Sequence, residues 1–76
     1  MKRTVAGERT TGTVVAFDFD VGLGTVEVSG HPGLRYRFHC TQIADGTRRV
    51  DVGASVGFAV VPTHGGVFEA ADVASI

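Results

Sequence analysis

The chain has little that could cross-link it or anchor it: one cysteine, no tryptophan and no long apolar run in 76 residues. Because Cys40 is alone, no internal disulfide can form, which suits a reducing compartment. The longest apolar runs, such as residues 59–61, are far too short to cross a bilayer. Residues 1–8 have basic side chains but no apolar stretch after them, so they do not match a signal peptide. We therefore expect one small cytoplasmic domain.

An excess of positive charge is also missing, since the formal net charge is −1. Proteins that bind nucleic acid mainly by neutralising phosphates are usually basic overall. Any basic surface on this chain must therefore be local. Six of the seven basic residues are arginine and there is no asparagine, a bias typical of a GC-rich bacterial genome.

No window of ten or more residues carries the i, i+3, i+4, i+7 apolar stripe of an amphipathic helix. Short β-branched and aromatic runs, separated by Gly, Pro and Asp, dominate instead. This pattern predicts five strands, over residues 12–19, 23–29, 34–40, 54–61 and 67–73. The longer connection between the third and fourth strands, residues 41–53, has room for one helical turn at residues 41–43.

Five short strands with one longer link indicate an all-β chain folded as a small barrel. Closing the sheet also removes edges that would otherwise be exposed. We expect a single barrel domain over residues 11–76, with residues 1–10 as an N-terminal tail or the start of the first strand. An SH3-like barrel is the rival, and its loop pattern fits this spacing less well.

The third predicted strand is the most informative segment, because successive side chains of a strand point to opposite faces. One face, which we assign to the core, carries Leu34, Tyr36, Phe38 and Cys40. The other face, which we assign to solvent, carries Arg35, Arg37 and His39. Three adjacent cationic or titratable groups make a local basic patch. Surface strands also carry arginine simply to stay soluble, so the strand alone leaves both interpretations open.

The fourth predicted strand shows the same alternation. It places Val56, Phe58 and Val60 on one face. We assign this face to the core, because apolar residues at alternate positions are typical of a half-buried strand.

Taken in order, the segments resemble a cold-shock domain. Residues 12–18, GTVVAFD, and residues 21–26, VGLGTV, are similar to G-x-V-K-W-F-[ND] and K-G-[FY]-G-F-I, the latter being the family's first ribonucleoprotein motif. Residues 37–40, RFHC, resemble the second motif, F-V-H-F. Further matches lie in residues 41–48, 52–58 and 69–73. The resemblance covers residues 11–73, and the ordered set is more specific than any single piece.

The resemblance implies an OB-type barrel of five antiparallel strands. In the family, aromatic side chains on the second and third strands stack the bases of single-stranded nucleic acid, and Lys and Arg hold the backbone. This chain departs from the family on that face. The family's tryptophan and platform phenylalanines are replaced here by Ala16, Leu23, Thr25, Arg37 and Cys40.

Two family lysines are also replaced, by Val15 and Val21, whereas Phe17 and His39 keep the family identity. Phe68 is an added aromatic that we expect near the same surface. Each lost stacking partner is worth about 1–3 kcal/mol, so the replacements would weaken binding by orders of magnitude.

We therefore predict a small module that binds single-stranded RNA or DNA weakly and with little sequence specificity. The candidate nucleic-acid-binding residues are Phe17, Leu23, Thr25, Arg35, Arg37, His39 and Phe68. Arg48 and Arg49 could extend the patch, although a solvated loop is the simpler interpretation. The alternative is a protein-interaction or self-association module that kept the barrel and lost the base-stacking face.

We expect no catalysis, no cofactor and no metal. Asp18 and Asp20 share a face by their period-two spacing, so a divalent ion is conceivable. With no third ligand evident, a solvated pair beside a turn is preferred. The remaining candidate ligands, which show no metal-ligand spacing, are His31, His39, His64 and Cys40. Cys40 also falls on the apolar side of its strand, where a buried, inert thiol is expected.

Overall fold

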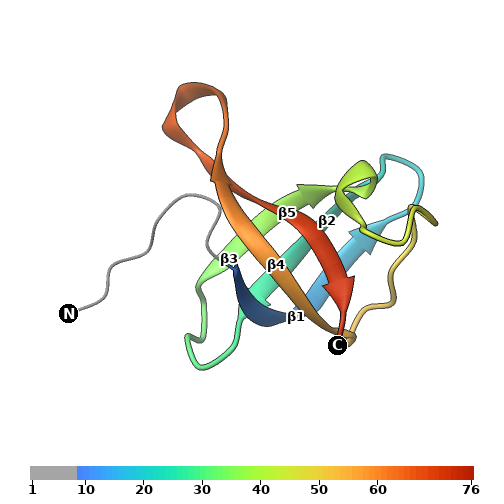
Figure 1. The fold of residues 1–76 in the computed structure, drawn as a ribbon, viewed down its shortest axis with the longest axis horizontal. Coiled ribbons are helices and arrows are strands. Elements are labelled where there is room, and N and C mark those ends of the chain that lie inside the picture. The colour runs from blue at the N-terminus through green and yellow to red at the C-terminus, as the bar shows by residue number, and fades with distance from the viewer. Residues whose placement is uncertain (1–8) are drawn as a thin grey trace.

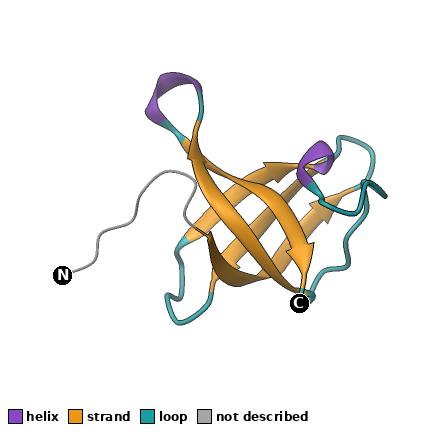
Figure 2. Cartoon of the chain, viewed as in Figure 1, coloured by secondary structure: helices purple, strands orange, loops and turns teal. Residues whose placement is uncertain are grey.

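The structure is a computed structural model that describes residues 9–76 as strands, loops and two single-turn 3-10 helices (Figure 1; Figure 2). The strands are β1 (Arg9–Asp18), β2 (Leu23–Val28), β3 (Arg35–His39), β4 (Ser55–Pro62) and β5 (Phe68–Ser75). The helical turns are η1 (Cys40–Gln42) and η2 (His64–Gly66). Within the described residues, no helix is long and apolar enough to span a bilayer.

All five expected strands are present, and η1 confirms the expected helical turn, one residue earlier than predicted. β1 begins at Arg9 instead of residue 12 because it pairs with two strands in succession. Its first part pairs with β4, from Arg9 opposite Ala59, and its second part pairs with β2, as far as Asp18 opposite Leu23. Of the expected tail, residues 1–8 lie outside the described residues, and the last two residues belong to β1.

The five strands form one antiparallel sheet in the order β3-β2-β1-β4-β5. The sheet curls until its two edge strands, β3 and β5, come into contact (Figure 1). Just after η1, Ile43 forms a parallel bridge to Val73, and the Ala44 N–H donates to the Val73 carbonyl at 2.7 Å. This arrangement is compatible with the small OB-type barrel, a five-stranded and partly open architecture.

A β-bulge in β1 lets one strand serve both halves of the sheet. The register against β2 shifts between Val14 and Ala16, and a bulge bends a strand and increases its local twist.

Gly24 lies directly opposite Phe38, and a Cβ on Gly24 would lie 2.3 Å from the Phe38 ring. The missing side chain therefore makes room for the buried Phe38 ring.

The core lies inside the curled sheet. Its largest fully buried side chains are Val14, Val26, Phe38, Val56, Phe58 and Val73. The core assignment of Val56, Phe58 and Val60 is confirmed, and so is that of Phe38. Burying each such side chain contributes about 1.5–3 kcal/mol.

Two of the other expected core residues of β3 are only half-buried. Tyr36 and Cys40, the latter at the start of η1, pack against the core from its margin, so the prediction of a buried thiol is wrong. The assignment of Leu34 to the core is also wrong, since this side chain is 42% exposed. The Leu34 N–H donates to the His31 carbonyl, which holds Leu34 in the turn before β3 begins. The alternation of a strand therefore does not apply to it.

The β4–β5 hairpin extends beyond the rest of the sheet (Figure 1). At its end, η2 lies between Pro62 and Phe68, which are opposite each other in the register. Val67 and Phe68 are both exposed there. The hairpin therefore carries apolar side chains away from the body of the domain.

Candidate nucleic-acid interface

The outer face of β1, β2 and β3 is arranged as three cross-strand rows, which we call the three-row face. The register gives the rows Asp18–Leu23–His39, Ala16–Thr25–Arg37 and Thr13–Glu27–Arg35. Directly opposite residues on one face of an antiparallel pair have their Cβ atoms about 4.5–5.5 Å apart. Each row is therefore a continuous strip, and successive rows are about 6.8 Å apart along a strand.

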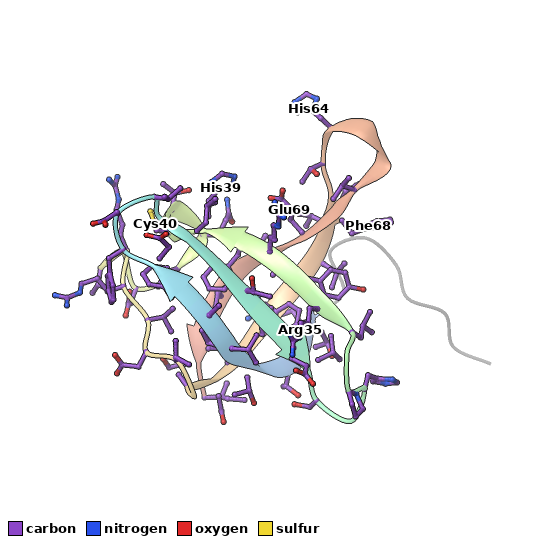
Figure 3. The ribbon with its side chains drawn as sticks, turned by 180° about the vertical axis from the view of Figure 1, so that it is seen from behind. Arg35, His39, Cys40, His64, Phe68 and Glu69 are labelled. Carbon is purple, nitrogen blue, oxygen red and sulfur yellow. The ribbon has the colours of Figure 1, made fainter. Side chains whose placement is uncertain are left out.

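The β3 side chains of this face point outward, as expected. Arg35, Arg37 and His39 are all exposed, while Phe38 between them is completely buried. Figure 3 shows His39 and Arg35 at opposite ends of the strand. The prediction that the three polar side chains share one exposed face is confirmed.

β2 lies between β1 and β3, and its outward-facing side chains fill the space between those of the two neighbouring strands. Leu23 lies opposite His39, and Thr25 lies opposite Arg37. Both side chains are half-buried. The structure thus brings five of the seven candidate residues onto one face, and these are Leu23, Thr25, Arg35, Arg37 and His39.

The formal charges of the carboxylates and guanidiniums on this face balance, because the three rows hold Asp18 and Glu27 as well as Arg35 and Arg37. The Arg35 guanidinium lies 3.2 Å from a carboxylate oxygen of Glu27, and the other carboxylate oxygen accepts the Gly33 N–H at 3.2 Å. Within residues 9–76, the side chains of Arg37 and His39 have no such hydrogen bond or ion pair. Arg37, in the middle row, is therefore the cation most available to a ligand.

Phe17 does not belong to the three-row face. Its ring stacks on Phe38 with centroids 6.2 Å apart and planes 19° apart, so it is turned toward the core. The bulge before Ala16 sets the alternation that follows, which places Ala16 and Asp18 outside and Phe17 inside. The expectation that Phe17 joins His39 on one surface is not met.

Phe68 also lies apart from this face. It is half-exposed near the end of the β4–β5 hairpin, opposite Pro62. Figure 3 shows Phe68 well separated from both His39 and Arg35. Phe68 has no counterpart in the family motifs, so the resemblance alone did not fix its position.

Two residues outside the predicted set form a contact at the end of the barrel. The Arg49 guanidinium carbon lies 5.2 Å from the centroid of the Phe19 ring, within the range of a cation–π interaction. Phe19 is 59% exposed and is the most exposed phenylalanine of the described residues. The sequence signal was an aromatic in a turn between two aspartates. Arg49 lies in an exposed loop, as the solvated-loop interpretation expects, and in addition it contacts Phe19.

Hydrogen bonds within the loop of residues 44–54 place Arg49. One Asp45 carboxylate oxygen accepts the Thr47 N–H at 2.9 Å and the Thr47 hydroxyl at 2.8 Å. The Thr47 hydroxyl oxygen in turn accepts the Arg49 N–H at 3.3 Å. The backbone N–H and the hydroxyl of Thr47 both lower the pKa of Asp45, because they stabilise its charged form.

The carboxylate pair beside the β1–β2 turn has a local structural role. One Asp18 oxygen accepts the N–H of Asp20 at 2.9 Å and that of Val21 at 3.2 Å. Such side-chain bonds to the backbone two or three residues on are how Asp fixes a turn. In residues 9–76, no three His, Cys, Asp or Glu side chains gather as metal ligands would.

We compared the chain with protein-family models and with curated proteins, and neither comparison finds a match. The resemblance to cold-shock domains stays a prediction from the motifs. The five-stranded antiparallel sheet and the composition of the three-row face are findings of the structure.

Proposed function

We propose that the protein is a small binding module for single-stranded RNA or DNA, which it holds weakly and with little sequence specificity. The observation that carries the proposal is the three-row face itself. It gathers Arg37 and His39 beside Thr25 and Leu23 on an exposed part of the sheet. Outer sheet faces of this kind take single strands whose bases lie flat against side chains.

Each side chain has a role that its chemistry allows. The planar guanidinium of Arg37 stacks on a base or forms a charge-assisted hydrogen bond to phosphate. The imidazole of His39 stacks or donates a hydrogen bond, and the Leu23 side chain between Asp18 and His39 gives a base an apolar floor. Thr25 offers a hydroxyl in the same row as Arg37.

The same geometry supports weak binding. His39 carries the only aromatic ring of the three rows, and Glu27 partly neutralises Arg35. Affinity of the kind seen for non-specific contacts, with Kd of about 1–100 µM at physiological salt, is expected. Because one or two phosphates are contacted, the slope of log K against log salt is expected to lie between about −0.7 and −1.4.

A titration tests this proposal. Labelled oligothymidylate and oligouridylate are titrated with the protein at two salt concentrations, alongside Arg37→Ala and His39→Ala. Salt-sensitive binding that falls in both variants supports the proposal. His64→Ala is the matched control, because Figure 3 shows His64 at the end of the hairpin, away from the three-row face.

No binding at protein concentrations on the order of hundreds of micromolar would overturn it. Equal losses in Arg37→Ala and His64→Ala would also do so, because they would show that the three-row face is not the contact surface. Sedimentation of the same samples reports self-association, which is the outcome that the protein-interaction alternative requires.

A further inference from the structure

An aromatic cluster of Phe17, Phe19 and Phe38 lies at the end of the barrel where β1 turns into β2. Phe17 packs on the buried Phe38, and Phe19 meets Phe17 edge-on, with centroids 4.9 Å apart and planes 86° apart. Arg49 lies over the Phe19 ring at 5.2 Å. Phe19 nevertheless remains 59% exposed. An exposed ring with packing beneath it and a guanidinium above it is a surface on which a further planar group can stack.

Both segments that carry this cluster are fixed by their own hydrogen bonds. Asp18 binds two backbone N–H groups of the β1–β2 turn, and Asp45 and Thr47 hold the loop before Arg49. Figure 1 shows the β1–β2 turn and the loop of residues 44–54 at the same end of the domain. Because the backbone of both segments is held in place, little loop entropy is lost when a ligand stacks there.

The cluster continues from the last row of the three-row face. Phe19 directly follows Asp18, which begins the Asp18–Leu23–His39 row. The Cys40 N–H donates to the Gly22 carbonyl at 2.8 Å, so the turn stays attached to the end of β3. A strand that follows β3 from Arg35 to His39 therefore arrives at this end of the barrel.

We infer that Phe19 and Arg49 form a further stacking position for a base of single-stranded nucleic acid, beyond the three-row face; this rests on the proposed function. The base stacks on the exposed surface of the Phe19 ring or on the outer plane of the Arg49 guanidinium. Asp18 and Asp20 lie in the same turn and disfavour phosphate there. The position therefore takes the base and leaves the backbone in solvent.

A length series separates this position from the three-row face. Oligothymidylates of about three nucleotides, one for each row, are compared with oligomers of about six, which reach the end of the barrel. Phe19→Ala and Arg49→Ala are expected to bind the longer oligomer roughly 5- to 100-fold more weakly and the shorter one like the parent protein.

Two conservative variants keep the fold and change the stacking surface. Phe19→Leu keeps an apolar side chain against Phe17, and Arg49→Lys keeps the charge without the planar guanidinium. Both are expected to lose affinity for the longer oligomer while their thermal unfolding stays close to that of the parent protein. A loss in these variants supports stacking, since neither charge nor packing has been removed.

The outcomes distinguish this inference from the proposed function. If the parent protein binds and Arg37→Ala weakens binding, but the Phe19 and Arg49 variants bind the longer oligomer unchanged, the inference fails alone. Equal losses for short and long oligomers also overturn it, because they place the effect on the three-row face. If the parent protein binds neither oligomer, the proposed function fails and the inference fails with it.

Discussion

The guanidinium of Arg35 lies 3.2 Å from the carboxylate of Glu27, its directly opposite neighbour on β2. Opposite charges that face each other across a strand pair attract, and here Glu27 partly offsets the charge of Arg35 on the exposed face of β3. Glu27 also accepts the Gly33 N–H, so it fixes the turn that leads into β3. Among residues 9–76, Arg37 is therefore the arginine of the three-row face that forms no ion pair.

Glu27→Gln is expected to increase affinity for single-stranded nucleic acid. The amide can still accept the Gly33 N–H, but it no longer neutralises Arg35. With one more phosphate contact, the slope of log K against log salt becomes steeper by about 0.7. Fluorescence anisotropy with a labelled oligothymidylate at several salt concentrations measures both quantities.

Asp51→Asn provides the control for that change. It alters the net charge by the same amount at an exposed loop residue that belongs to none of the three rows. If Asp51→Asn steepens the salt slope as much as Glu27→Gln does, the effect comes from overall charge, and Arg35 is not the added contact.

The sequence pattern was sufficient where period-two alternation applies. It placed Phe38 inside and Arg37 outside, because both lie within β3. It failed for Leu34, which a turn hydrogen bond removes from the strand, and for Phe17, which follows a bulge. Hydrophobic pattern alone does not show where a turn ends or where a bulge reverses the faces.

Contacts between segments that are distant in the sequence could not be predicted from the hydrophobic pattern, for another reason. The partnership of Glu27 and Arg35 requires the register between β2 and β3. The contact between Phe19 and Arg49 requires two loops to meet at one end of the barrel. Neither is encoded by local periodicity, so the charge of the face and the added stacking position could only be found in the structure.

Gly24→Ala is expected to destabilise the domain. The new Cβ would lie 2.3 Å from the Phe38 ring, whose surroundings are fully packed. Overpacking a core costs about 1–3 kcal/mol in the free energy of unfolding. Urea denaturation measures this change, and Thr25→Ala, on the next residue but the outer face, should stay within about 0.5 kcal/mol of the parent protein. Equal stability of Gly24→Ala and the parent protein would contradict the packing of Phe38 against Gly24.

The ion pair between Arg9 and Asp72 connects the first and last strands. The guanidinium lies 2.7 Å from the Asp72 carboxylate, and the Asp72 N–H donates to the Gln42 side-chain oxygen at 3.2 Å. Asp72 has a φ of 52°, a conformation that Asp and Asn tolerate better than other side chains. The residue thus combines a charge contact with an uncommon backbone conformation.

Two substitutions of Asp72 separate these contributions. Asp72→Asn removes the charge and keeps the tolerance of positive φ, so with both partners exposed it should lower the free energy of unfolding by less than about 1 kcal/mol. Asp72→Val should cost about 1–2 kcal/mol more, because a β-branched residue is strained there. Thermal denaturation at low and high salt measures both. Salt should reduce the effect of Asp72→Asn, and an effect that salt leaves unchanged would contradict the ion-pair contribution.

Acid should loosen the loop that carries Arg49. The pKa of Asp45 is lowered from its ordinary value of 3.8 by hydrogen bonds from Thr47. The stability that this carboxylate contributes is therefore present above pH 3.8 and is lost as the pH falls through the lower pKa that Asp45 has in the folded protein.

Thr47→Ala removes the hydroxyl bond and should raise the Asp45 pKa toward 3.8. An NMR titration of the Asp45 carboxyl in both proteins measures this shift, and a pKa that stays unchanged in Thr47→Ala would show that the hydroxyl does not stabilise the charge. Since the Thr47 hydroxyl also accepts the Arg49 N–H, the same titration should show the Phe19 ring resonances moving with Asp45 in the parent protein.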